Sequence, residues 1–330
     1  MARRGSSASL RDRIEYVGYR AGLSLLSSLP APLTYGVAAA AARLAFRVDA
    51  GRRGIALANL RIAFPELAEP ARAEIARRSY THFAHHAVDV VRALRIGESE
   101  LVARFDLVGR EHFDAARARG RGVIALLPHL GSFELLALVG PALGVDACVV
   151  TRPLSNRLIH AELLARRGAR GAQILAHRNV APGLLRALRR GETVAILNDQ
   201  YTRRSKGIFS PFFGVRASTS PGPALLALRS GAPVLPLHLV RLSRERHRLV
   251  CGAALELPRR GDLRADVEAA TARLNAALEA LIRAQPEQWI WGHRRFRHSP
   301  DLPQEPYRRP RAVRRSEALR AGGVRPSGAP

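Results

Sequence analysis

The segment LLPHLGSFELL, from Leu126 to Leu136, places a histidine and a glutamate in an otherwise apolar run. His129 and Glu134 are five residues apart, a spacing that would separate their side chains by about 140° on a regular helix. They can meet only if His129 lies in a turn and Glu134 in the first turn of the following helix. Gly131 and Ser132 suit such a turn, and we expect Ser132 to cap that helix.

This pair could perform general-base chemistry. A neutral imidazole can take a proton from a substrate hydroxyl group, and a carboxylate bonded to its other nitrogen would orient the ring and stabilise the imidazolium. No serine or cysteine nucleophile is evident beside the pair. The predicted reaction is therefore direct attack by a hydroxyl group on an activated acyl group. A buried core histidine followed by a helix-start glutamate is the alternative interpretation of so short a pattern.

Apolar runs with β-branched residues alternate with helical patterns over most of the chain. Strands are predicted at 121–129, 147–152, 192–199, 233–242 and 246–257. Helices are predicted at 134–143, 156–167, 180–190, 220–230 and 262–285, the last with Asp262 as its N-cap. This alternation indicates an α/β fold, with a layered mixed sheet flanked by helices.

Three of the predicted strands end in polar side chains. His129 follows the first strand, Arg152 the second, and Asp199 with Gln200 the third. Sites in open α/β sheets gather beyond the carboxyl ends of the strands, so we expect these groups to share one site. Arg152 could bind a substrate phosphate through two hydrogen bonds, or pair with Asp199 or Glu134 and only shape the site. Asp199 is expected to organise this arginine rather than to act as a second base.

The composition restricts the class of partner. The 330 residues carry a formal charge of +26, which favours an acidic partner: nucleic acid, an anionic membrane, or an acidic protein or substrate. Lys206 is the only lysine, and biased codon usage explains much of the arginine excess. With aromatic residues at 5% and no stacking module, a nucleic-acid partner is not predicted, although a basic binding protein remains the alternative to an enzyme. Cys148 and Cys251 make neither a disulfide framework nor a zinc site.

The two ends of the chain differ from its middle. Residues 1–48 begin with a basic segment and continue as an apolar stretch that Pro30 and Pro32 divide into two helices. The part from Leu33 to Phe46 alone is too short for a straight span. We predict that these helices associate with a membrane; ordinary core helices are the alternative. Further helices are predicted at 50–64 and 69–94. We assign 49–302 to the main domain and predict that the Pro- and Arg-rich tail, 303–330, is disordered.

The segment PHLGSFELL resembles the H-x4-D/E motif of glycerolipid and lipid A acyltransferases. Further segments occur in the same order and spacing in the late acyltransferases of lipid A biosynthesis, the lauroyl/myristoyl transferase family: ANLRIAFPEL (58–67), TRPLSN (151–156), NDQ (198–200), GIFSPFFGVRASTSPGPALLALRSGAPVLP (207–236) and PEQWIWGHRRFR (286–297). The resemblance covers about residues 10 to 300.

This resemblance implies a glycerolipid acyltransferase-like α/β fold and a membrane-associated enzyme on the cytoplasmic face of the cell inner membrane. It implies an acyl carrier protein thioester as donor, a lipid A precursor as acceptor and no cofactor. His129 matches the general base of the family and Glu134 its acidic partner. Bacterial phosphatidylinositol mannoside acyltransferases look similar, and Arg157 stands where proline is frequent. A different glycolipid acceptor, or a coenzyme A donor, therefore stays open.

Three further residues are candidates for substrate contacts. Lys206, in the basic loop RRSKG, could bind phosphate or be a solvated loop residue. Phe213 could line an acyl-chain pocket or pack in the core. Arg294 follows Trp289 and Trp291, and this group is typical of a membrane-interface edge.

A histidine pair invites a metal interpretation. His82 and His86 are one helical turn apart in the segment HFAHH. They lack a third ligand nearby in the sequence, and no metal site is predicted.

Overall fold

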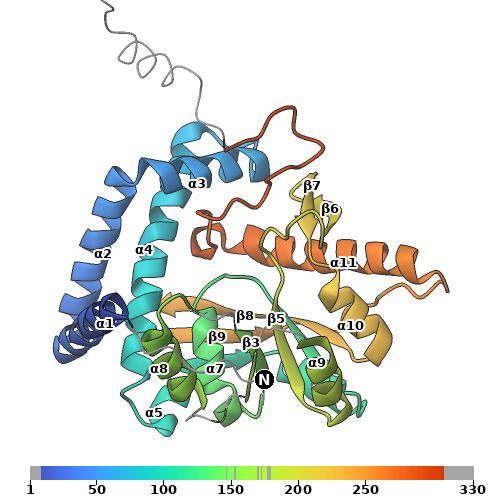
Figure 1. The fold of residues 1–330 in the computed structure, drawn as a ribbon, viewed down its shortest axis with the longest axis horizontal. Coiled ribbons are helices and arrows are strands. Elements are labelled where there is room, and N and C mark those ends of the chain that lie inside the picture. Colours follow the sequence, from blue (N-terminus) through green and yellow to red (C-terminus); the bar gives the residue numbers. More distant parts are fainter. Residues whose placement is uncertain are drawn as a thin grey trace, which may run out of the picture.

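The computed structural model describes residues 9–145, 147–151, 154–168, 171, 173–176 and 180–307. The first part of this chain is helical, with α1 (Leu10–Ser28), α2 (Ala31–Val48), α3 (Ala50–Ala63) and α4 (Glu69–Ala93). Pro30 separates α1 from α2 as predicted, because its ring favours a helix start and cannot continue the preceding helix. Figure 1 shows α2 lying alongside α4.

In the described part of the chain, seven strands form the main sheet, in the order β1-β9-β8-β2-β5-β3-β4. Their bounds are β1 (Phe105–Val108), β2 (Val123–Leu127), β3 (Ala147–Thr151), β4 (Gln173–Ala176), β5 (Thr193–Leu197), β8 (Val234–Ser243) and β9 (Arg246–Cys251). The strand β2 pairs in parallel with β5 on one side and with β8 on the other. The strand β9 runs antiparallel to β8, so the predicted mixed sheet is confirmed. The carboxyl ends of β2 and β5 meet at one edge.

The remaining elements flank this sheet or extend from it. They are α5 (Glu98–Val102), α6 (Arg110–Arg117), η1 (Phe133–Leu135), α7 (Leu136–Val139), η2 (Pro141–Leu143), α8 (Arg157–Gly168), α9 (Val180–Arg189), α10 (Gly222–Ser230), α11 (Leu263–Ala284), η3 (Pro286–Gln288) and the hairpin β6 (Ile208–Phe212) with β7 (Val215–Thr219). The helix predicted at 134–143 is three short pieces, and α7 ends before Pro141 because proline lacks the N–H donor that would continue the helical ladder. The N-cap prediction for Asp262 is confirmed, since its carboxylate accepts bonds from the N–H groups of Arg264 and Ala265.

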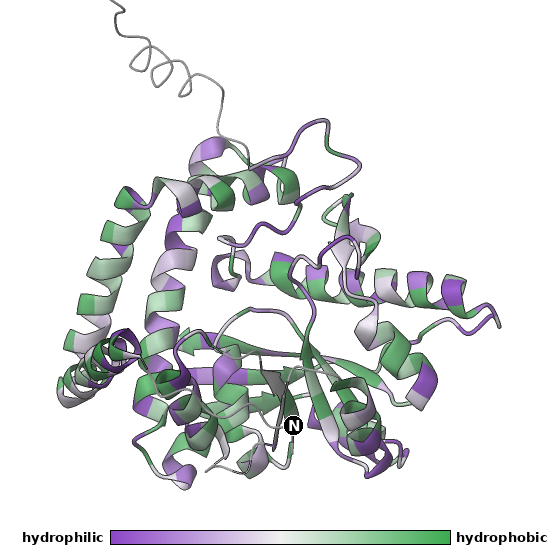
Figure 2. Cartoon of the chain, in the orientation of Figure 1, coloured by the Kyte–Doolittle hydropathy of each residue, from purple (hydrophilic) through white to green (hydrophobic). Residues whose placement is uncertain are grey.

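The core lies on both faces of the sheet. Ile124 and Leu126 of β2 pack into one apolar cluster with the indoles of Trp289 and Trp291. The alternate residues of the same strand, such as Val123, face a second cluster on the opposite side. Every residue of β2 is buried, as expected for a parallel strand covered on both faces. In Figure 2 the strands are mostly coloured as hydrophobic.

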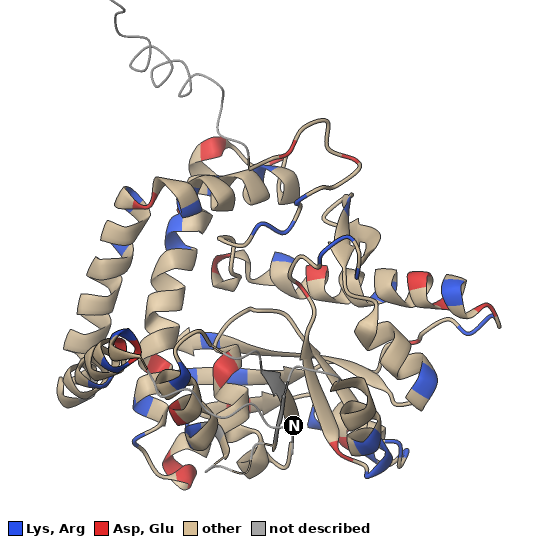
Figure 3. Ribbon diagram, in the orientation of Figure 1, with Lys and Arg blue, Asp and Glu red and all other residues tan. Residues whose placement is uncertain are grey.

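The N-terminal helices combine buried and exposed surfaces. Thr34 and Tyr35 of α2 are buried, which shows that part of the apolar segment packs within the fold. Charged residues are sparse along α2 (Figure 3). Within the described residues, no helix has both the length and the apolar character that crossing a bilayer requires.

The predicted disorder of the tail is wrong for its first residues. The hydroxyl group of Tyr307 accepts a bond from the backbone N–H of Phe296 at 2.9 Å and bonds the side chain of Asn59. Residues 303–307 thus continue the packed domain. The tail from residue 308 lies outside the described residues.

Candidate active site

His129 lies in a turn that two backbone contacts hold at the end of β2. The N–H of Gly131 donates to the carbonyl of Gln288 at 2.9 Å, and the N–H of Ser132 donates to the carbonyl of Leu239 at 3.2 Å. Gly131 has a φ of 63°, and a Cβ atom there would lie 1.5 Å from the Leu239 carbonyl oxygen. Only glycine therefore allows this turn to approach β8 so closely.

Asp199 reaches the same place from the end of β5. Its carboxylate is fully buried and accepts three hydrogen bonds. Its Oδ1 lies 2.6 Å from Nδ1 of His129, and its Oδ2 accepts from the His129 backbone N–H at 2.7 Å. Oδ2 also accepts from the indole Nε1–H of Trp289 at 2.6 Å. Because a carboxylate can only accept, Nδ1 of His129 carries the donated proton and Nε2 is left to accept one.

The electrostatics favour a charged pair. Burial lowers the pKa of His129, but the charge of Asp199, the hydrogen bond between them and the charge of Glu134 outweigh it, so the pKa lies above its ordinary value. Burial raises the pKa of Asp199, yet the charge of His129 and the bonds from His129 and Trp289 keep it below its ordinary value. Since 19% of the His129 side chain is exposed, a substrate group can reach the ring.

The structure corrects the prediction about which acid orients the histidine. The carboxylate at Nδ1 belongs to Asp199, not to Glu134. The reason is tertiary: β2 and β5 are parallel neighbours, so Asp199 meets the ring across the sheet edge. Glu134 lies half-buried in η1, and its negative charge still raises the pKa of His129. The capping prediction for Ser132 is wrong, because its side chain makes no capping bond to η1.

Buried polar side chains of α4 lie against this turn. Asp89 accepts a bond from Nε of Arg241 at 2.8 Å and one from the Tyr35 hydroxyl group, and its Oδ2 lies 3.5 Å from the Ser132 hydroxyl oxygen. Burial raises the pKa of Asp89, against the opposing effect of Arg241 and of the Tyr35 bond. These contacts join α2, α4 and β8 to the turn that carries His129.

The histidine pair of α4 belongs to this buried layer. The His86 ring centroid lies 5.2 Å from that of Phe133, which lies 5.1 Å from that of His129. Burial lowers the pKa of His82 to about 4 and that of His86 to about 3, so both rings are neutral at pH 7. In the described part of the chain, no three His, Cys, Asp or Glu residues are grouped as a metal site would require.

The other predicted site residues are dispersed. Gln200 is half-buried beside Asp199, and Lys206 is exposed in the turn that precedes β6. Arg152 lies outside the described residues, so its predicted pairing with Asp199 has no structural description. Phe213 is 2% exposed and packs against Phe64 with ring centroids 5.8 Å apart, which supports the core-packing interpretation.

Arg294 is exposed and lines a surface hollow of about 450 Å³ with Arg297 and His298. Nδ1 of His298 lies 3.2 Å from the hydroxyl oxygen of Tyr201, two residues after Asp199. The hollow is thus linked to the loop that follows β5.

The membrane-interface prediction for Trp289 and Trp291 is wrong. Both indoles are within 1% of complete burial, because they pack in the core cluster that also contains Ile124 and Leu126 of β2. Sequence reasoning missed the bond from Trp289 to Asp199; the signal was that a buried indole N–H needs an acceptor.

Arg295 was also missed. It is fully buried, and it donates to the Ser218 carbonyl at 2.8 Å and to Thr219 Oγ1 at 2.7 Å. Burial lowers its pKa to about 10, against the opposing charge of Asp199, so the guanidinium stays charged at pH 7. A buried cation thus accompanies the buried carboxylate.

Comparison with known proteins places the chain among bacterial acyltransferases. The family described as bacterial lipid A biosynthesis acyltransferase matches residues 6–298. The lipid A biosynthesis lauroyltransferase of Escherichia coli (strain K12) is 27% identical over 296 residues, covering 84% of this chain and 90% of that protein. The palmitoleoyltransferase of the same organism is 30% identical over 254 residues, covering 76% and 80%. A phosphatidylinositol mannoside acyltransferase of Mycolicibacterium smegmatis is 24% identical over 241 residues, covering 69% and 76%. Because the family match spans most of its length, the chain belongs to the bacterial lipid A biosynthesis acyltransferase family.

Proposed function

We propose that this enzyme transfers a fatty acyl group from an acyl carrier protein thioester to a hydroxyl group of a lipid A precursor. Nε2 of His129 takes the hydroxyl proton as the hydroxyl oxygen attacks the thioester carbonyl carbon. The tetrahedral adduct collapses, the C–S bond breaks, and the imidazolium returns the proton to the leaving thiolate. The acyl group passes directly to the acceptor oxygen without a covalent acyl-enzyme.

The observation that carries the proposal is the 2.6 Å contact between Nδ1 of His129 and Asp199 at adjacent strand ends. In this mechanism Asp199 holds the imidazole in the tautomer whose Nε2 is a base, and it stabilises the imidazolium that forms. We assign Glu134 a supporting electrostatic role, because its charge adds to that of Asp199 in raising the pKa of His129.

Both proposed substrates suit a basic protein. Acyl carrier proteins are acidic and phosphorylated glycolipids are anionic, so the charge of +26 favours the encounter with each. We propose that the hollow lined by Arg294 and Arg297, with Glu305 also in its lining, binds an anionic group of a substrate, because guanidinium groups bind phosphate oxygens bidentately. Arg152, Gln200 and Lys206 remain proposed substrate contacts.

We further propose that the enzyme works on the cytoplasmic face of the cell inner membrane. Large apolar side chains are exposed on the two N-terminal helices: Leu10, Ile14, Val17 and Leu25 on α1, and Leu33, Val37, Leu44 and Val48 on α2. Their spacing of three or four residues, with one longer gap in each set, gives each helix an apolar face. Such faces support association with the membrane interface.

The test is an acyl-transfer assay on the detergent-solubilised full chain. Labelled acyl carrier protein and coenzyme A thioesters are offered with a lipid A precursor or with a phosphatidylinositol mannoside. We expect label on the lipid A precursor from the carrier-protein donor, and none with His129→Gln, whose amide cannot act as a base. Transfer of label to the mannoside would show that the acceptor is a phosphatidylinositol mannoside, as in the name of the Mycolicibacterium smegmatis relative. Undiminished transfer by His129→Gln would refute the mechanism.

A further inference from the structure

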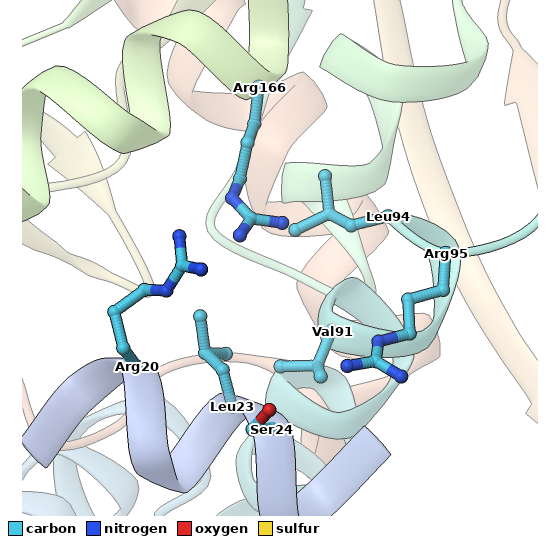
Figure 4. A pocket seen from close by; sticks show the side chains of 7 residues that line it. All are labelled: Arg20, Leu23, Ser24, Val91, Leu94, Arg95 and Arg166. Atoms are coloured by element: carbon cyan, nitrogen blue, oxygen red, sulfur yellow. The ribbon is translucent and has the colours of Figure 1, made fainter. Parts of the chain in front are cut away.

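A small pocket at the junction of α1, α4 and α8 has three arginines along its wall. Arg20 comes from α1, Arg95 follows α4, and Arg166 lies on α8, around a cavity of about 60 Å³. One hydroxyl group and three apolar side chains complete the lining: Ser24, Leu23, Val91 and Leu94. Figure 4 shows the guanidinium groups of Arg20 and Arg166 directed into the space between them. Among the residues that the structure describes, no acidic side chain is part of this lining.

The carboxylate nearest to these arginines does not fill the pocket. Glu162 accepts from Nε of Arg166 at 2.7 Å and from Nη1 of Arg20 at 3.3 Å, which sets the position of both guanidinium groups. Glu162 itself is not among the lining residues. Across the described residues, Arg95 forms no ion pair. Glu162 therefore pairs with two of the three arginines, and an added anion would relieve the repulsion among the positive charges that line the pocket.

The pocket borders the exposed apolar face of α1. At 100° per residue, Leu10, Ile14, Val17 and Leu25 lie on one face of this helix, and Arg20 with Ser24 lies at the edge of that face. A group held by these arginines would thus sit beside the surface that we propose to meet the membrane. This arrangement matches a lipid, whose anionic headgroup lies next to its apolar chains.

We propose that this pocket binds a phosphate group, supplied by the headgroup of a membrane lipid. Guanidinium N–H groups donate to phosphate oxygens, and the Ser24 side chain adds a hydroxyl group to the same wall. The site is separate from the His129–Asp199 pair and takes no part in the acyl transfer. Its role is to hold the enzyme on the bilayer.

The experiment compares full-length wild-type protein with Arg95→Gln and with Arg119→Gln. Arg119 is an exposed arginine just beyond α6 and outside the pocket, so its variant loses the same charge. Flotation is measured with phosphatidylcholine vesicles that contain phosphatidic acid, and with vesicles of equal charge whose anion is a fatty-acid carboxylate. Binding of inorganic phosphate is measured separately by calorimetry. Acyl transfer to detergent-dispersed substrate is followed in parallel.

We expect Arg95→Gln to weaken binding to phosphatidic acid vesicles about tenfold relative to Arg119→Gln, with no such difference on carboxylate vesicles. Acyl transfer in detergent stays at the wild-type rate, so a failure here is distinct from a failure of the proposed reaction. Arg95→Gln alone could abolish the calorimetric binding of phosphate and leave vesicle binding unchanged. That result would support a phosphate site, but its ligand would be a soluble phosphate rather than a lipid headgroup. Equal effects of the two variants in every assay would overturn the proposal, because net charge alone would then explain binding.

Discussion

Replacing Asp199 by asparagine tests the role of the buried carboxylate. In the native protein its two oxygens accept from three donors: Nδ1 and the backbone N–H of His129, and Nε1 of Trp289. An asparagine side chain has one oxygen, and its amide nitrogen can only donate. At least one donor therefore loses its acceptor. If the amide nitrogen faces Nδ1, the imidazole must carry its proton on Nε2, and the base is lost.

The wrong tautomer and the missing charge both reduce catalysis. For a His–carboxylate pair such a change lowers kcat by roughly 10⁴-fold, which corresponds to about 5 kcal/mol. A shift in the pH profile should accompany it. His129 must be neutral to act as a base, so activity rises with pH through its pKa, which in the native protein lies above the ordinary value of a histidine. Without the charge of Asp199, burial is opposed only by Glu134, and the acid limb moves to lower pH.

The assay is kcat/KM for acyl transfer against pH, with thermal unfolding of each variant. Asp266→Asn is the matched control, because Asp266 is also buried and accepts bonds from the backbone N–H groups of Arg260 and Gly261, away from the His129–Asp199 pair. We expect Asp266→Asn to lose stability and to keep its kcat and pH profile. A folded Asp199→Asn protein with kcat within tenfold of wild type, or with an unmoved acid limb, would refute the reasoning.

Three further changes probe the same site. Gly131→Ala should lower the melting temperature and reduce kcat about 100-fold. The reason is that the added Cβ would lie 1.5 Å from the Leu239 carbonyl oxygen and displace the turn that carries His129. A native-like kcat would contradict this expectation. Glu134→Gln should shift the acid limb of kcat/KM to lower pH by less than Asp199→Asn does, since its charge is the smaller influence; an upward shift would disprove the assigned role. Trp289→Phe should reduce kcat/KM about tenfold through loss of the 2.6 Å bond to Asp199, and an unchanged value would show that this bond is dispensable.

Much of the fold was predictable from local patterns. The strands β2, β3, β5 and β8 were expected because buried parallel strands are continuous apolar runs, and the prolines marked the break between α1 and α2. Short or polar strands were not predicted. The strand β4 has only four residues, and β1 carries Asp106 in its middle, so neither forms a long apolar run.

The candidate site was predicted in part. His129 and Asp199 were expected at one sheet edge, because both follow buried strands that the α/β pattern makes parallel. Their direct bond was not predicted, since strand order is not encoded in the spacing along the chain. Trp289 was predicted at a membrane edge, because tryptophans beside arginines are typical of such an edge. The same residue types occur here in a core that buries both Trp289 and Arg295, and the sequence alone does not distinguish the two cases.

By itself, the sequence determined the mixed α/β class, the identity of His129 as a candidate base and the acidic groups available to it. These follow from properties of single segments: apolar periodicity, proline breaks and the chemistry of each side chain. Only the tertiary structure decided that Asp199 rather than Glu134 bonds Nδ1, that Trp289 bonds Asp199 from the core, and that Asp89 lies against the turn at Ser132. Such choices depend on which strands become neighbours, and that is settled by packing between residues far apart in the chain.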